Sequence, residues 1–78
     1  MKIIQEEGLQ NKLYGSQGYA DPKNREVFID SSLETREKSL VAIHEVLEIW
    51  LGKRIKHSKI DMIAIDIIDV MMQLGELK

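Results

Sequence analysis

The chain has 78 residues, of which 44% are hydrophobic and 31% charged, and its net charge at pH 7 is -2. This composition predicts one globular domain spanning residues 1–78. It excludes an intrinsically disordered chain and a membrane-spanning one, because no segment reaches the roughly 20 apolar residues that a membrane helix needs. Cysteine is absent, so disulfides and thiolate metal sites are excluded, and a metal ion would have to be bound by histidine and carboxylate side chains.

The first part of the chain predicts β-structure. A short strand is expected near Lys2–Gln5. Tyr19–Asp30 predicts a hairpin, because the segment Asp21–Asn24 places proline at the second position of a turn and Asn24 where a positive φ is tolerated. The return strand of this hairpin is expected at Glu26–Asp30.

A first helix is expected directly after the hairpin. Ser31 and Ser32 are its candidate N-caps, and Glu34 follows Ser31 at the spacing of a capping box. The helical pattern continues to Leu51, and Gly52 ends it.

A second helix is expected to use Ser58 as its N-cap and to reach Leu74, with Gly75 as its terminator. Together these elements predict an α+β fold, in which a small N-terminal sheet or hairpin is followed by two main helices.

Three ionisable residues interrupt the otherwise apolar segment Leu40–Leu51 of the first helix. They are His44, Glu45 and Glu48. Glu48 lies ~40° around the helix axis from His44 and Glu45 lies ~100° away, so all three project from one side. A helix as apolar as this one is expected to be buried nearly all round, where a histidine or glutamate without a partner costs several kcal/mol. Each of the three therefore needs a partner or an ion.

A metal ion can satisfy all three side chains. Residues four apart stand one above the other on a helix, so His44 and Glu48 can reach a single ion, while Glu45 falls to the side, where it can hold a water molecule bound to that ion. This is the geometry of the HExxH motif, whose glutamate acts as a general base. Here the sequence reads HEVLE, with Glu48 in place of the second histidine. The simpler interpretation is an i,i+4 ion pair between His44 and Glu48, with Glu45 facing solvent.

Asp61 is the expected third ligand of such an ion. It lies with Ile65, Ile68 and Met72 on the apolar side of the second helix, which must face the first helix. Catalytic zinc sites usually combine three protein ligands with water. Two alternatives stay open. Ser58 and Asp61 have the spacing of a capping box, and His57, in the basic link before this helix, competes as the third ligand.

The remaining features have simple interpretations. The basic link between the helices complements the dipole of the preceding helix C-terminus. A DNA-binding helix-turn-helix is not expected, because the link is too long and the second helix too apolar to contact bases. Trp50, Met62, Met71 and Met72 are expected to fill the core, and any exposed part of that apolar surface is a candidate partner or dimer interface.

The order of these features resembles a known family. The segment GYADPKNREVFIDSSL, the segment HEVLEIWLG and a following helix that carries an acid are similar to the small zincin-like metallopeptidases of phages and mobile elements, related to the ImmA/IrrE type. In that family, a hairpin strand ending in a similar phrase leads into the HExxH helix, and an acidic residue on the next helix completes the site. The similarity covers residues 14–74 and depends on the order of several short motifs.

The resemblance implies a zincin-like fold, zinc as the cofactor and a peptide substrate. Carried over by position, His44 matches the first zinc ligand, Glu45 the general base and Asp61 the acidic ligand. Glu48 departs from the pattern and leaves two carboxylates with one imidazole, a harder ligand set than zinc usually receives. By the same resemblance, the strand Glu26–Asp30 lies beside the cleft, where a peptide can pair with the sheet edge.

We therefore expect a metal-binding, metallopeptidase-like protein in which His44, Glu48 and Asp61 hold zinc or another divalent ion and Glu45 activates water. The alternative is a non-catalytic zincin-like module that binds or regulates a protein. The sequence favours a cytoplasmic monomer or weak homo-oligomer with a peptide or protein partner, and neither nucleic acid nor a membrane surface is expected to bind.

Overall fold

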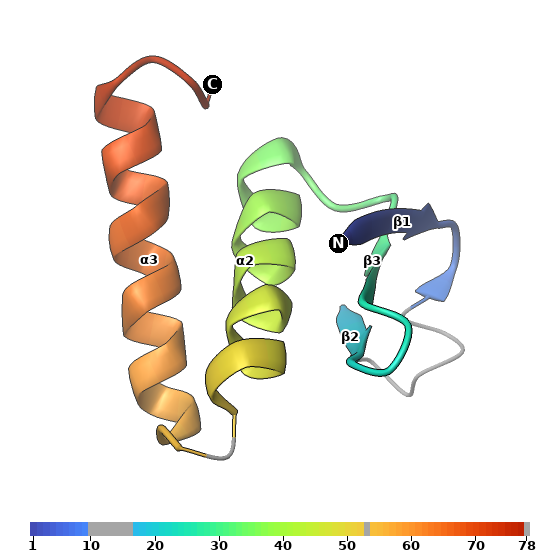
Figure 1. Ribbon diagram of the computed structural model, residues 1–78. Helices are drawn as coiled ribbons and strands as arrows, with labels where there is room; N and C mark the ends of the chain where they lie inside the picture. The colour runs from blue at the N-terminus through green and yellow to red at the C-terminus, as the bar shows by residue number, and fades with distance from the viewer. Residues whose placement is uncertain (10–16, 53, 78) are drawn as a thin grey trace.

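The computed structural model describes residues 1–9, 17–52 and 54–77, which contain a three-stranded sheet followed by two helices. The predicted α+β fold class is confirmed. Figure 1 shows one helix between the sheet and the other helix. The elements in chain order are β1 (Lys2–Glu6), β2 (Gly18–Asp21), β3 (Glu26–Asp30), α2 (Thr35–Leu51) and α3 (His57–Gln73).

The sheet has the order β1-β3-β2, in which β1 is parallel and β2 antiparallel to the central strand β3. Alternation along β3 separates its two faces. Val27 and Ile29 are buried, while Phe28 stacks on its register partner Tyr19 with the ring centroids 4.6 Å apart. Because side chains alternate along a strand, this aromatic pair lies on the face opposite Val27 and Ile29.

The central position of β3 corrects one expectation. Both edges of β3 are hydrogen-bonded within the sheet, so the strand Glu26–Asp30 cannot offer an edge to a peptide. The edge strand that approaches α2 is β2.

Gly18, the first residue of β2, allows α2 to pack closely on the sheet. A Cβ atom at this position would lie 2.7 Å from the carbonyl oxygen of Phe28 and 2.7 Å from Cγ1 of Val41. Real side chains do not tolerate such distances, so glycine is the residue that fits where the strand and the helix meet.

The start of α2 differs from the expected cap. The helix begins at Thr35 with Glu34 as its N-cap residue, and no side chain caps it. The buried carboxylate of Asp30 accepts hydrogen bonds from the Ser32 amide at 2.8 Å and from the Ser32 hydroxyl at 2.6 Å. These hydrogen bonds hold Ser32 beside β3. Its hydroxyl therefore does not cap α2, because local side-chain hydrogen bonds compete with helix capping. The capping box of Ser31 and Glu34 is therefore wrong.

The expectation that the apolar part of α2 is buried nearly all round is also wrong. The helix contacts the sheet on one side and α3 on another, and none of its residues is fully buried. Trp50 is 62% exposed rather than a core anchor. The guanidinium carbon of Arg25 lies 5.0 Å from its ring centroid, within cation–π range. Arg25, and not Asn24, is the residue of the β2–β3 turn with a positive φ.

The helix α3 begins at His57 rather than after Ser58, and the carbonyl oxygen of Lys56 accepts hydrogen bonds from two amides of its first turn. Its fully buried line is Ile60, Ala64 and Ile68. Of the residues expected on this side, Ile68 is buried, whereas Ile65 and Met72 are exposed. Met62, expected to fill the core, is exposed as well.

The predicted end of α3 is confirmed. Gly75 has a φ of 76°, and the amides of Gly75 and Glu76 donate to the carbonyl oxygens of Met72 and Met71. This is the hydrogen-bond pattern with which a glycine commonly closes a helix. Among the described residues, no helix is both long and apolar enough to cross a membrane.

Candidate metal centre

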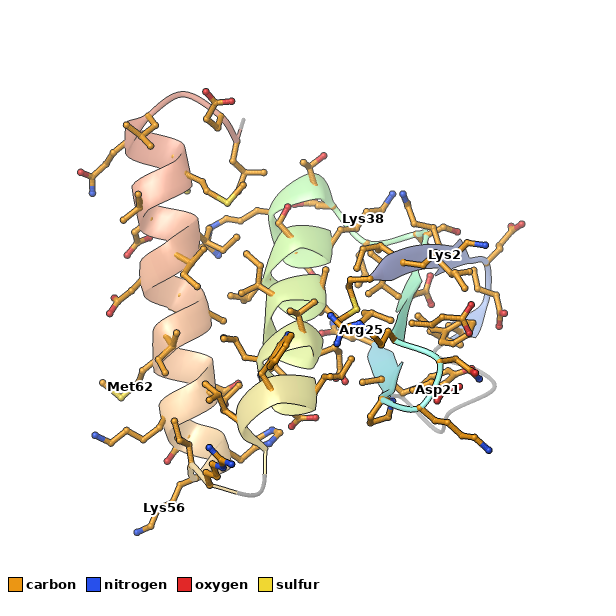
Figure 2. All side chains as sticks on the ribbon, in the orientation of Figure 1. Lys2, Asp21, Arg25, Lys38, Lys56 and Met62 are labelled. Carbon is orange, nitrogen blue, oxygen red and sulfur yellow. The ribbon has the colours of Figure 1, made fainter. Side chains whose placement is uncertain are left out.

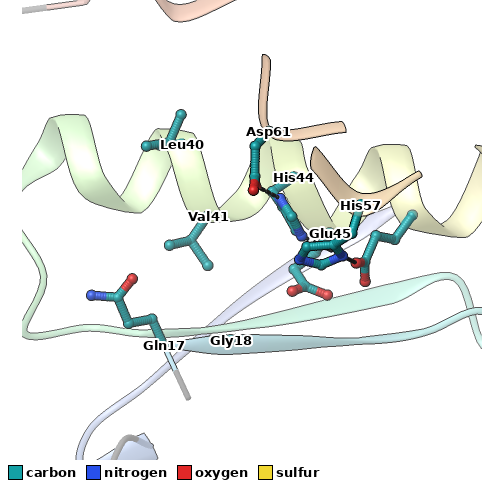
Figure 3. A pocket seen from close by; sticks show the side chains of 9 residues that line it. Gln17, Gly18, Leu40, Val41, His44, Glu45, His57 and Asp61 are labelled. Atoms are coloured by element: carbon teal, nitrogen blue, oxygen red, sulfur yellow. Dashed lines mark hydrogen bonds and ion pairs between the residues drawn. The ribbon is translucent and has the colours of Figure 1, made fainter. Parts of the chain in front are cut away.

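Five ionisable side chains meet in a cleft of about 390 Å³ between α2, α3 and the start of β2. The helix α2 supplies three of them and the first turns of α3 the other two. Figure 3 shows His44 and Glu45 of α2 beside His57 and Asp61 of α3. They are His44, Glu45, Glu48, His57 and Asp61. The predicted projection of His44, Glu45 and Glu48 from one side of α2 is thus observed.

His44 contacts a carboxylate through each of its ring nitrogens. Its Nδ1 lies 2.6 Å from Oδ1 of Asp61, and its Nε2 lies 3.1 Å from Oε1 of Glu48. A neutral ring that donates its Nδ1 proton to Asp61 has only a lone pair at Nε2, and the Glu48 oxygen is an acceptor as well. Two acceptors at this distance require a proton or a metal ion between them.

His57 reaches the same carboxylate oxygen from the other helix. Its Nδ1 lies 2.7 Å from Oε1 of Glu48, and its ring meets that of His44 edge-on with the centroids 4.4 Å apart. The ligand atoms of His44, Glu48 and His57 all lie within 4.8 Å of one another. Two donors that each lie about 2.1 Å from a tetrahedral ion are about 3.4 Å apart, so small side-chain adjustments bring these three atoms around one ion.

Glu45 stands between this cluster and the edge strand. Its half-buried side chain lines the cleft and also a second hollow formed with Gly18, Tyr19 and Ala20 of β2. Burial raises the pKa of the Glu45 carboxyl above its usual range, and the negative charge of Glu48 raises it further, while His44 and His57 oppose these effects. A carboxyl with a raised pKa is suited to accept and return a proton closer to neutral pH.

The structure separates the two candidates for the third ligand. Asp61 lies on the far nitrogen of His44, whereas His57 joins His44 and Glu48. His57 does so because α3 begins two residues earlier than expected, which places it on the helix and one turn before Asp61. Ser58, the second residue of α3, is not its N-cap residue, so the capping interpretation of Asp61 is wrong.

Several residues that line the cleft carried no signal in the sequence. Gln17, Gly18, Leu40 and Val41 form its apolar and amide-lined wall. Gly18 opens the segment GYADPKNREVFIDSSL, and Leu40 and Val41 begin the apolar segment of α2, but neither pattern pointed to a role in the cleft. Their position there follows from the packing of α2 against β2.

Comparison with known proteins finds no matching family model, no matching curated protein and no matching solved structure. The resemblance to zincin-like metallopeptidases therefore stays a prediction from the sequence, and the function has to be argued from the cleft itself.

Proposed function

We propose that this protein binds a divalent metal ion, zinc first, through His44, Glu48 and His57, and that it hydrolyses peptide bonds in a zincin-like cleft. One observation carries the proposal: donor atoms from two helices converge within 4.8 Å, and a further carboxylate holds the other nitrogen of the most buried ligand.

The chemistry of these donors supports zinc. Two imidazoles and one carboxylate, with a fourth position left for water, are a recurring ligand set of catalytic zinc sites. The set is softer than the expected combination of one imidazole with two carboxylates, because His57 takes the place of Asp61. The same donors also suit ferrous iron, so metal analysis has to include both ions.

Asp61 then acts as a positioning residue. Metal-bound histidines commonly donate their second ring N–H to a carboxylate, which fixes the tautomer and the ring orientation. The 2.6 Å contact between Nδ1 of His44 and Oδ1 of Asp61 has this form. It leaves Nε2, the nitrogen on the Glu48 side, free to bind an ion.

A bound zinc ion would act as a Lewis acid that polarises a water molecule and the scissile carbonyl. Glu45 is the residue placed to take a proton from that water molecule and to pass it to the leaving amine, since its carboxyl lies in the cleft next to the three ligands. His44 and His57 hold their positions through the Asp61 and Glu48 carboxylates.

The edge strand β2 supports an extended peptide as the substrate. Among the described strands it pairs with β3 alone, and its residues share a hollow with Glu45 and Glu48. An extended peptide that adds to this edge by main-chain hydrogen bonds would cross the hollow beside Glu45.

The first test is metal content followed by titration. Protein purified without chelator or nickel should contain close to one zinc or iron per chain, and isothermal titration of the stripped protein should show one site. His57→Ala should weaken binding by at least tenfold, whereas Lys59→Ala, an exposed neighbour on the same helix, should not. Equal affinity of wild type and His57→Ala would contradict the proposed ligand set.

The second test concerns hydrolysis. Glu45→Gln keeps the shape of the side chain but removes the base, so cleavage of a peptide library should cease while zinc affinity is retained or increased. Cleavage that survives this substitution would exclude the proposed role of Glu45.

A non-catalytic binding module is the second candidate. The side chains of His57 and Asp61 are 68% and 54% exposed, so the cleft is open to water, which weakens metal binding and electrostatic catalysis. If the protein is such a module, wild type and Glu45→Gln should both bind peptide, and neither should cleave it. For both candidates, we propose the cytoplasm as the compartment, from the cysteine-free sequence.

A further inference from the structure

A line of apolar side chains runs along α3 beside the face that packs on α2. We define it as the outer stripe, made of Ile63, Ile67, Val70 and Leu74. Val70 is 55% and Leu74 70% exposed, and Ile63, Ile67 and Val70 line a shallow groove together with Asp66 and Met71. In Figure 1, α2 flanks α3 on one side only. Exposed apolar surface of this extent on one helix marks an interaction site.

The spacing of the outer stripe is that of a helix–helix seam. Its residues follow one another at intervals of four, three and four, which is the repeat by which two helices pack knobs into holes. The line buried against α2, formed by Ile60, Ala64 and Ile68, lies roughly 90° away around the helix axis. The stripe is therefore a second packing face, separate from the core.

We propose that the outer stripe is the interface of an antiparallel homodimer, in which α3 of one copy packs on α3 of a second. The intervals of four, three and four read the same in both directions, so the reversed stripe is its own complement. Ile63 meets the partner's Leu74, and Ile67 meets the partner's Val70. Such a twofold contact closes on itself and forms no filament.

Charge selects the same orientation. The N-terminal end of α3 carries Lys56 and Lys59, and Glu76 follows its C-terminal end. In the proposed antiparallel register, Lys59 lies within one helical turn of the partner's Glu76, whereas a parallel pair places Lys59 beside its own copy. Figure 2 shows Lys56 at the N-terminal end of α3.

The dimer leaves the candidate metal centre open. His57 and Asp61 lie on the α2 side of α3, well around the helix from the outer stripe. The interface therefore does not depend on the proposed function, and each can fail without the other. A seam of four layers is short, so an association in the micromolar range is expected.

Sedimentation equilibrium of the full chain over a range of concentrations tests this interface. Wild type should dissociate from dimer to monomer on dilution, and Val70→Glu should weaken the dimer by at least a hundredfold, because it buries a charge at the centre of the seam. The matched control is Met62→Glu, a 64% exposed apolar residue on the polar side of α3, labelled in Figure 2; it should dimerise like wild type. Thermal unfolding by circular dichroism checks that both variants are folded.

Two outcomes overturn the proposal. One is a wild-type chain that remains monomeric up to about 1 mM, above the range in which a specific dimer of this size forms, which would leave the stripe to a different protein. The other is a dimer that Val70→Glu does not weaken more than Met62→Glu.

Disulfide trapping tests the orientation, because the natural chain has no cysteine. A mixture of the variants Ile63→Cys and Leu74→Cys should form a mixed disulfide dimer under mild oxidation. Leu74→Cys alone should not, since two copies of this position would lie about 16 Å apart along the antiparallel helices. Efficient self-linking of Leu74→Cys would show a parallel pair and contradict the proposed interface.

Discussion

At the scale of single residues, the Glu45 carboxyl is a source of instability in the metal-free protein. Burial and the charge of Glu48 raise its pKa in the folded state. A raised pKa means that ionisation favours the unfolded chain. The free energy of unfolding is therefore not reduced by this group below the pKa of the unfolded chain. It falls as the pH rises from there through the pKa of the folded state.

Glu45→Gln should therefore stabilise the chelated protein at neutral pH and progressively less as the pH falls, until below about 4 the carboxyl is protonated in both states. Urea unfolding of both proteins with a chelator, at several pH values, measures the difference in free energy. A difference that grows as the pH falls would contradict this account.

Glu48→His restores the HExxH sequence and tests the contact of this carboxylate with both imidazoles. Three imidazoles around one ion suit zinc better than two with a carboxylate, and the change removes a negative charge beside Glu45. Zinc affinity should rise by on the order of tenfold, or about 1.4 kcal/mol. If Glu48 is only an ion-pair partner of the histidines, titration will show equal or weaker zinc binding by the variant.

At the scale of elements, the close approach of α2 to β2 sets the width of the cleft. Gly18→Val should lower the free energy of unfolding by roughly 1–3 kcal/mol, since its side chain would overlap Val41 and the backbone of β3. It should also weaken zinc binding, because α2 carries two of the three ligands. The control is Ala20→Val, two residues farther along β2. If Ala20→Val lowers the free energy of unfolding as much as Gly18→Val does, the special role of the glycine is contradicted.

The elements themselves were largely predictable from the sequence. Local signals predicted β1, the hairpin, the end of α2 at Leu51 and the closure of α3 by Gly75, because proline, glycine and apolar periodicity act within a few residues. The order of the strands was not predictable, since the pairing of β1 with β3 joins segments more than 20 residues apart. The helix starts were missed because Asp30 engages Ser32 and because α3 begins without a side-chain cap.

The candidate site shows the same division. Helical spacing places His44, Glu45 and Glu48 on one side of α2 whatever the fold, so the sequence identifies them. His57 was the weaker candidate, because its role depends on where α3 begins and on how α3 crosses α2. The residue at which α3 begins and the way α3 crosses α2 place His57 with His44 and Glu48, where Asp61 was expected. They place Asp61 at the other ring nitrogen of His44.

At the scale of the whole molecule, the candidate ligands join α2 to α3. An ion that binds only the folded state at a hundred times its Kd adds about 2.7 kcal/mol to the free energy of unfolding. In a chain of this size, that raises the Tm by on the order of 10–20 °C. Scanning calorimetry with and without zinc measures the shift, and His44→Ala should abolish it. An unchanged Tm at millimolar zinc and pH 7–8 would show that the cluster is not a metal site.

The pairing of β1 with β3 has a consequence for how the chain is made. Synthesis runs from the N-terminus, so β1 leaves the ribosome first, but it has no partner until β3 has followed it. His57 and Asp61 emerge later still. The sheet can therefore close only once β3 has emerged, and the cleft is completed last. A ribosome-bound chain that ends near Leu51 already carries the HEVLE segment, but it lacks His57 and so cannot bind an ion with all three proposed ligands.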